Sequence, residues 1–435
     1  MSDPLVMYTG HPLVDVGAAA LTIMAGRNGP EELDVRDLDR AADEMLEAYR
    51  GAEMRSYLSV LFPNSAYVNP TMGDDKRQAF VETYVRAYRT DAGLGVPCVF
   101  TGRPASVRIY RQHLPLITGE GTFNFLPGGQ AGLPVSGAAL LCIQAMPLGT
   151  LRAQGRALLV HSSENVLTFE YARRFIAMNR DERLKAGLGK TGPSPRTFVL
   201  RELAEIERTA RLQAKSDQPE GVTVYHLTNY GTNANVDIYP LPAFMVDFLR
   251  QVQGLPAWQR LVAHYWQVGK KDDGLTRNIL YEQVFGLPDN AQRFVHEFLI
   301  GRPRPGFAPG PRTTWELVEL FLRKVLNVPK TRIDVIQSVA GKLSKHITDR
   351  MDASLFSMLF RCNNFRELRW RLIRANESNA RKDEELVVTF DEFTELFAMS
   401  EDLARNDWRL AWDLTLLRVM ELLDGFLSTE QVKAE

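Results

Sequence analysis

Residues 98–149 read CVFTGRPASVRIYRQHLPLITGEGTFNFLPGGQAGLPVSGAALLCIQAMPLG, which is the layout of a two-knuckle metal finger. Each knuckle of such a finger aims two thiolates, about three residues apart, at one tetrahedral ion. Cys98 begins a first knuckle, but Thr101 stands where its second thiolate would be. Residues 136–139, where the partner pair would fall, contain no cysteine. We therefore expect a degenerate finger that is held by packing, with no metal and no other cofactor.

The segment upstream of the finger is expected to be helical. Within residues 11–60, the apolar side chains of Val14, Ala18 and Leu21 share one face of a helix. Residues 34–51 show helical spacing and end in a glycine, which is typical of a helix C-terminus. These patterns predict helices packed beside the finger.

The segment downstream of the finger contains the predicted strands. Residues 95–245 are rich in glycine, proline and β-branched residues, and they include a predicted helix near residues 202–214. A turn is expected at residues 230–232, a Tyr-Gly-Thr tripeptide flanked by asparagines. The predicted strands are residues 157–160, 222–227 and 236–239. The fold class is therefore α+β, with an N-terminal portion over residues 1–300.

A proline-rich segment separates this portion from a helical C-terminal domain. Residues 301–312 read GRPRPGFAPGPR, with four prolines and three glycines, so they can form neither a helix nor a central strand. We interpret them as a linker or an ordered binding loop. Residues 313–435 read as amphipathic helices, apart from a short VVTF stretch, and predict a helical bundle.

Composition limits the classes of protein to consider. At 435 residues, 45% of them hydrophobic, the chain can bury two or three cores. Its net charge of −1 is not the overall basic charge of a free-standing nucleic-acid binder. Three scattered cysteines fit a reducing compartment better than a disulfide framework. No apolar run reaches the ~18 residues of a membrane span, so we expect a cytoplasmic protein without membrane contact.

The net charge of the whole chain is close to zero, but basic and acidic residues are segregated near the C-terminus. We call this segregation the charge split. Residues 323–382 contain 14 Lys and Arg against 5 Asp and Glu, whereas residues 383–424 contain 3 Arg against 12 acids. The basic half centres on RCNNFRELRWRLIR, residues 361–374. Wound as a helix, this stretch places Phe365, Leu368 and Leu372 on an apolar side. Its cations are Arg361, Arg366, Arg369, Arg371 and Arg374, with Arg366, Arg371 and Arg374 on the opposite side and Arg369 at the border.

Two interpretations of these arginines remain open. A basic helix face can bind phosphate backbones through ion pairing and counterion release. It can equally be a solvated face that the neighbouring acidic helices neutralise. Trp370 falls on the arginine side, either as a stacking platform for bases or as a core residue under a neighbouring helix.

Three further groups of side chains are candidate nucleic-acid contacts. The amides of Asn229, Asn233 and Asn235 can read base edges, although asparagines also occur at turns for their geometry alone. Lys270 and Lys271, in a glycine-flanked turn, would meet phosphate. Arg302 and Arg304 in the proline-rich segment complete the set.

Enzyme-like motifs are present only in incomplete form. Residues 187–191, GLGKT, resemble the end of a phosphate-binding loop, but Leu184 occupies the position of its first glycine and a helical pattern precedes it. The seven histidines show no His-x-x-x-His spacing, and Ser136 lacks the glycine two residues earlier that a nucleophile elbow requires. We predict that the protein is not an enzyme. An unrecognised carboxylate site in a nucleic-acid-processing enzyme is the alternative.

Five segments together resemble a known family. They are TGHPLVDVGAAAL (9–21), YLSVLFPNSAYVNP (57–70), the degenerate finger, GRALLVHS (155–162) and VYHLTNYGTNANVDIYPLP (224–242). Their order and spacing resemble the CRISPR-associated large subunits that are named for two Cys-x-x-Cys pairs and serve type I-B and related Cascade complexes. The resemblance covers roughly the first 245 residues.

The resemblance implies a noncatalytic role in RNA-guided DNA targeting. Guide RNA would read the target by base pairing, while the large subunit contacts the short adjacent motif and helps open the duplex. The implied partners are guide RNA, target DNA, the backbone subunits of the complex, and a recruited helicase-nuclease or transposition factor. The family's C-terminal helices resemble the small subunit, which lines the displaced strand. A purely structural assembly subunit is the remaining alternative.

Overall fold

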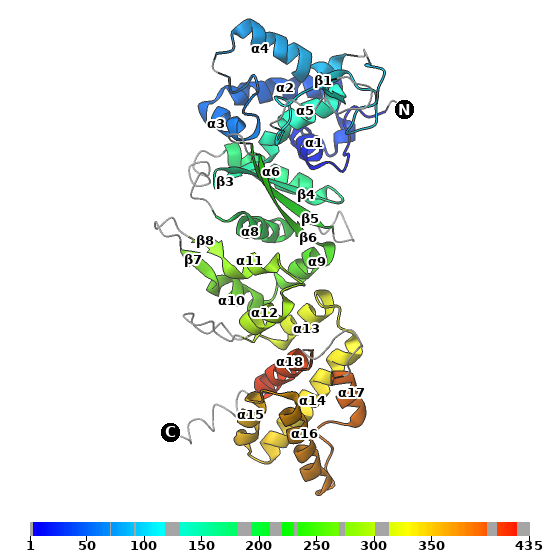
Figure 1. Ribbon diagram of the computed structural model, residues 1–435, viewed down its shortest axis with the longest axis vertical. Helices are drawn as coiled ribbons and strands as arrows, with labels where there is room; N and C mark the ends of the chain where they lie inside the picture. Colours follow the sequence, from blue (N-terminus) through cyan, green and yellow to red (C-terminus); the bar gives the residue numbers. More distant parts are fainter. Residues whose placement is uncertain are drawn as a thin grey trace. The chain divides into compact units, whose positions relative to one another are not determined.

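The computed structural model describes residues 3–69, 71–90, 93–117, 131–180, 193–208, 220–229, 234–268, 275–300, 313–397 and 407–423. The fold is mixed α+β, 61% helical, with small antiparallel sheets and a helical C-terminal part, which confirms the predicted fold class (Figure 1). The chain divides into two compact units. Unit 1 comprises Met1–Val246 and Trp266–Phe285, and unit 2 comprises Asp247–Tyr265 and Gly286–Glu435.

This division differs from the boundary predicted between residues 300 and 313. Helices from before residue 300 belong to unit 2 because their aromatic side chains pack on a later helix, α13 (Trp315–Lys324). Phe248 meets Phe321 edge-on at 5.8 Å between ring centroids, and Phe294 stacks on Phe321 at 5.3 Å. The predicted linker, residues 301–312, lies outside the described residues.

The first layer of unit 1 consists of helices around α1. The predicted helical character of residues 11–60 is confirmed by α1 (Pro12–Ala25), α2 (Val35–Arg50) and α3 (Ala52–Leu61). Asp34 begins α2 with a capping box, in which its side chain accepts from Asp37 N. The middle of α1 is buried and packs on α5 (Gly137–Ala145).

The second layer of unit 1 is a four-stranded antiparallel sheet in the order β3-β4-β5-β6. Its strands are β3 (Leu151–Ala153), β4 (Arg156–Ser162), β5 (Val222–Thr228) and β6 (Asn235–Leu241), which confirms the three predicted strands. Four consecutive β4 residues, 157–160, are at most 1% exposed, and α1, α3 and α6 all pack on this strand. The register pairs Thr228 with Asn235. The predicted turn between these strands, residues 230–232, lies outside the described part of the chain.

Further short elements complete unit 1. The helix predicted near residues 202–214 begins earlier, as α8 (Pro195–Arg208), and residues 209–214 are not described. The remaining elements are η1 (Pro30–Glu32), α4 (Asp74–Phe80), η2 (Val81–Val85), η3 (Ala87–Arg89), β1 (Val107–Ile109), β2 (Leu133–Val135), η5 (Met146–Gly149), α6 (Val166–Arg180), β7 (Trp266–Val268), β8 (Leu275–Asn278) and α11 (Ile279–Val284).

Buried polar contacts join four of the five segments on which the family resemblance rests. The fully buried Asp15 carboxylate accepts from Thr9 N at 2.7 Å and from Gly10 N at 2.9 Å, and it lies 3.0 Å from His161 Nε2. Asn229 N donates to Val60 O at 2.7 Å. A buried carboxylate needs several donors to offset its desolvation. These motif residues therefore hold the N-terminal segment, α1, α3, β4 and β5 together.

Unit 2 is helical in all of its described elements. Its longest helix, α14 (Lys330–Asp349), buries Ile333, Ile336 and Leu343 and packs on α18 (Asp407–Leu422), where Trp412 is 1% exposed. The other elements are α9 (Ala243–Val252), which begins in unit 1, α10 (Pro256–His264), α12 (Ala291–Phe294), η6 (Val295–Leu299), α13, α15 (Ala353–Phe360), α16 (Phe365–Ala380) and α17 (Phe390–Phe397). None of the helices in the described ranges is both long and apolar enough to cross a bilayer.

Candidate nucleic-acid interface

The two predicted knuckle segments meet in the structure. Cys98 N donates to Arg103 O at 2.6 Å, and Gly102 adopts a positive φ of 71° while its N–H returns to Cys98 O at 2.9 Å. β1 pairs with β2, and Val99 N donates to Pro134 O at 3.1 Å. The loop that begins at Cys98 is thereby joined to the strand that leads into Ser136.

Hydrogen bonds surround the Cys98 sulfur. Burial alone would raise the pKa of this thiol, but bonds from the Thr101 side chain and from the backbone of Ser136, Phe100 and Thr101 outweigh burial and lower it. Among the described residues, no three His, Cys, Asp or Glu side chains are arranged to hold a metal ion. That residues 98–149 are a degenerate finger without zinc stays a prediction.

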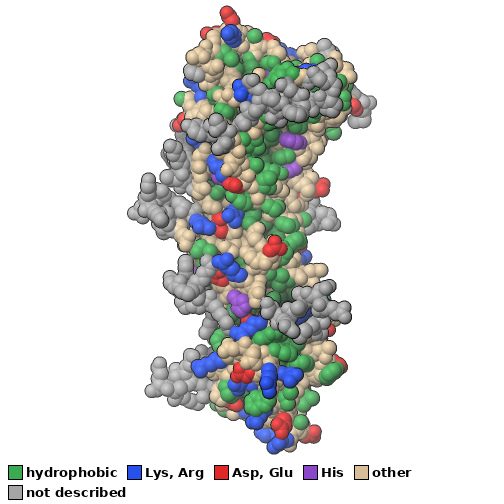
Figure 2. Space-filling model, in the orientation of Figure 1, with side chains coloured by type: hydrophobic (Ala, Val, Ile, Leu, Met, Phe, Trp, Pro, Cys, Tyr) green, Lys and Arg blue, Asp and Glu red, His purple; other side chains and the backbone are tan. Residues whose placement is uncertain are grey.

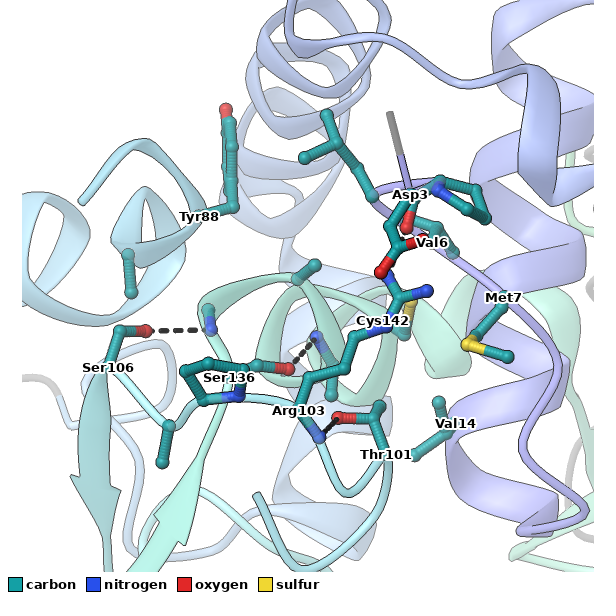
Figure 3. A pocket seen from close by; sticks show the side chains of 18 of the residues that line it. Asp3, Val6, Met7, Val14, Tyr88, Thr101, Arg103, Ser106, Ser136 and Cys142 are labelled. Carbon is teal, nitrogen blue, oxygen red and sulfur yellow. Dashed lines mark hydrogen bonds between the residues drawn. The ribbon is translucent and has the colours of Figure 1, made fainter. Parts of the chain in front are cut away.

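Thr101 and Ser136–Ala139, the positions at which the finger interpretation predicted missing ligands, line one cavity of about 320 Å³, shown in Figure 3. Thr101 Oγ1 accepts from Arg103 N at 3.3 Å, and Ser136 Oγ accepts from Ala139 N at 3.4 Å, capping α5. Ser106 Oγ accepts from Gly137 N at 2.9 Å. These hydroxyl groups are therefore used in local backbone bonds that shape the Cys98–Arg103 loop and the start of α5.

The predicted basic helix exists as α16. Asn364 caps it by accepting from Glu367 N at 2.8 Å. Leu368 and Leu372 are at most 1% exposed, as predicted for the apolar side. Phe365 is half-buried and packs against Trp408 at 5.6 Å between ring centroids. Packing of this side fixes which residues of α16 remain at the surface.

The exposed face of α16 differs in one residue from the face predicted. Arg366, Arg369 and Arg374 are exposed, and so is Arg361, directly after α15. Arg371 is only 20% exposed, and its Nη2 lies 2.6 Å from Glu367 Oε1. Arg371 was predicted on the open side, but an ion pair one helical turn away holds it against its own helix.

The acidic half of the charge split neutralises two cations, Lys342 in α14 and Arg350 directly after it. Glu384 Oε2 lies 2.6 Å from Arg350 Nη2, and Glu392 Oε1 lies 2.9 Å from Lys342 Nζ. Despite burial, hydrogen bonds from Ser338 and Lys342 lower the pKa of Glu392 to about 2. Neutralisation by acidic neighbours therefore holds for Lys342 and Arg350.

The same neutralisation does not extend to α16. Within the described ranges, Arg361, Arg366, Arg369 and Arg374 form no ion pair with a carboxylate. On the face in Figure 2, Lys and Arg side chains gather over the region of α14, α15 and α16. Unneutralised cations on a fixed helix form a surface suited to phosphates.

Trp370 is an exposed residue of this face. Its side chain is 51% exposed, and the Arg374 guanidinium lies 4.3 Å from the ring centroid. The alternative of a core tryptophan is therefore wrong. Ile373, which the sequence analysis did not single out, is 57% exposed beside it. We call Arg366, Arg369, Trp370, Ile373 and Arg374 the arginine face. Its members lie at i, i+3, i+4, i+7 and i+8, a spacing that could have identified Ile373.

The described asparagine candidates, Asn229 and Asn235, lie in unit 1 and not on this face. Asn229 is fully buried, with its Nδ2 donating to Leu61 O at 3.4 Å, so it is not placed to meet a base edge. Asn235 is exposed in unit 1, where its Oδ1 accepts from Arg156 Nη2 at 3.4 Å. The candidates Asn233, Lys270, Lys271, Arg302 and Arg304, together with residues 187–191, lie outside the described residues.

No protein-family model matches the sequence, and no curated protein matches it.

Trp370→Ala is expected to weaken binding of a fluorescent oligothymidylate by about 5- to 150-fold, because stacking of one base on an aromatic ring contributes about 1–3 kcal/mol. Ile373→Ala removes an exposed apolar side chain of the same face but no ring, and it should leave affinity within about twofold. Fluorescence anisotropy measures the affinity of both variants for the oligothymidylate. Equal losses in the two would show that exposed apolar area, rather than stacking, holds the strand.

Proposed function

We propose that the protein is the noncatalytic large subunit of a type I CRISPR Cascade complex, which recognises the motif beside the target and stabilises the opened DNA. The observation that carries the proposal is the arginine face of α16, whose cations have no acidic partner in the described part of the chain. The chain as a whole has a net charge of −1, so attraction to nucleic acid would be confined to local surfaces.

The proposed role of this face follows from its chemistry. Guanidinium groups would bind successive phosphates of one DNA strand, and Trp370 would support an unstacked base. Stacking of this kind tolerates any base, which suits a strand whose sequence varies from target to target. Sequence recognition is delegated to pairing with the guide RNA.

The resemblance that implies the Cascade role rests on unit 1. Its motif residues are joined by the buried contacts of Asp15, His161, Asn229 and Val60 described above. Polar residues used in this way maintain a framework and are not free for catalysis. Asn235, which stays exposed next to Arg156, remains a candidate for contact with the motif.

Reconstitution tests the proposal. The chain, guide RNA and type I backbone subunits should form a complex that binds a target with the adjacent motif at least tenfold more tightly than the same target without it. DNA should remain intact with Mg²⁺ present. Cleavage by the complex would favour the nucleic-acid-processing enzyme. Assembly without any contribution of this chain to DNA affinity would favour the purely structural subunit.

A further inference from the structure

Unit 1 has a second, larger hollow that neither the arginine face nor the knuckle cavity involves. It is a groove of about 1160 Å³ between α2 and α3 on one side and β3 and the end of α6 on the other. Its apolar lining residues are Met24, Met54, Met178, Leu148, Leu151 and Ile176. A hollow of this size accommodates several apolar side chains.

Methionine is prominent in this lining. Met24, Met54 and Met178 are each half-buried, so their flexible thioethers are partly accessible. Methionine side chains adapt to differently shaped partners, and they are frequent in grooves that receive helices. Ala48 and Ala52, exposed at the junction of α2 and α3, keep the entrance free of large side chains.

The two walls of the groove carry opposite charges. Glu44 and Glu53 are exposed on the α2–α3 wall, and neither forms an ion pair within the described ranges. Glu47 on the same wall is paired with Arg50 at 2.6 Å.

Arg152 and Arg180 lie on the β3–α6 wall. Arg152 Nη1 donates to Ser56 Oγ at 3.3 Å, and its Nε is buried with no hydrogen-bond partner among the described residues. The α2–α3 wall therefore presents carboxylates, and the β3–α6 wall presents guanidinium groups that donate hydrogen bonds.

An extended strand is a poor occupant for this groove. β3, the edge strand that reaches it, is only three residues long. The Thr150 carbonyl just before β3 already accepts from Asn179 Nδ2 at 2.8 Å. The backbone groups of the helical walls are bonded within their own helices, so a strand would leave its own N–H and C=O groups unpaired.

We infer that the groove binds an amphipathic α-helix of a partner protein, with an apolar stripe on the methionine floor, basic residues facing α2–α3 and acidic residues facing Arg152 and Arg180. A helix satisfies its own backbone, and it presents an apolar stripe with charged residues on both flanks. This inference does not depend on the proposed Cascade role, and its test uses the chain without nucleic acid.

Three designed peptides test the charge pattern. Each is a labelled helix of about 20 residues with the same leucine stripe. One has lysines on one flank and glutamates on the other, the second has lysines on both flanks, and the third has glutamates on both. The mixed peptide should bind about tenfold more tightly than either of the others, because only it complements both walls. Equal binding of the three, or no binding of any, would overturn the inference.

Variants of the chain locate the site. Glu44→Lys with Glu53→Lys makes both walls basic, so preference should move to the glutamate peptide. Ala48→Trp should fill the entrance and reduce binding at least tenfold. Ala177→Trp is the matched control, because Ala177 is an exposed alanine of α6 outside the groove lining, and it should bind normally. Equal affinity in the two tryptophan variants would show that the peptide binds elsewhere. Self-association that Ala48→Trp abolishes would identify a second copy as the occupant and reject a separate partner.

Discussion

Replacing Arg366, Arg369 and Arg374 together with glutamate is expected to weaken the binding of opened target DNA by roughly tenfold or more. The three guanidinium groups are exposed and have no carboxylate partner in the described residues, so each is available to a phosphate. Each single-strand phosphate contact contributes about 0.7 to the salt slope, and the loss of three should reduce its magnitude by about 2. Titration of the assembled complex at several salt concentrations measures both quantities.

A matched control separates this local effect from that of total charge. Arg50, Arg208 and Arg293 are between 59% and 78% exposed, and each is paired with a glutamate three or four residues away. Reversing these three to glutamate changes the net charge equally, but it should leave affinity and salt slope near those of the parent chain. Both variants should fold, since exposed charges contribute little to stability. If the first variant assembled and bound DNA with an unchanged salt slope, the arginine face would be only a solvated surface.

Gly17→Ala is expected to lower the free energy of unfolding of unit 1 by about 3 kcal/mol or more, because overpacking a close helix contact is costly. An added Cβ at Gly17 would lie 1.7 Å from Cys142 O, in the backbone of α5. The side chain of Cys142 cannot relieve this contact by rotating, so α1 and α5 must separate. Hydrogen exchange measured by mass spectrometry should show faster exchange in both helices.

Gly341→Ala, at another helical glycine, is expected to stabilise the protein instead. A Cβ at Gly341, within α14, meets no atom of the described residues within 4 Å. The substitution should slow exchange in α14 and stabilise the helix by roughly 1 kcal/mol, because alanine loses less backbone entropy on folding. Unchanged exchange in α1 and α5 of the Gly17→Ala variant would mean that these helices are not packed as closely as the structure has them.

Local patterns in the sequence predicted the elements well. The predicted strand segments became β4, β5 and β6, and the apolar periodicity of residues 361–374 buried Leu368 and Leu372 in α16. Such features depend on side-chain period and backbone preference, which neighbouring residues determine.

The sequence by itself thus determined the fold class, the main helices and strands, and the existence of a basic helix near the C-terminus. Only the tertiary structure decided which cations stay unpaired. Glu384 and Glu392 are distant from Arg350 and Lys342 along the chain, yet they neutralise these two and leave the arginine face open. Tertiary packing likewise buried Asn229 against α3 and brought Cys98 beside Ser136. Ion pairs and buried hydrogen bonds act over a few ångströms, so they depend on which distant segments meet, and local sequence patterns do not contain that information.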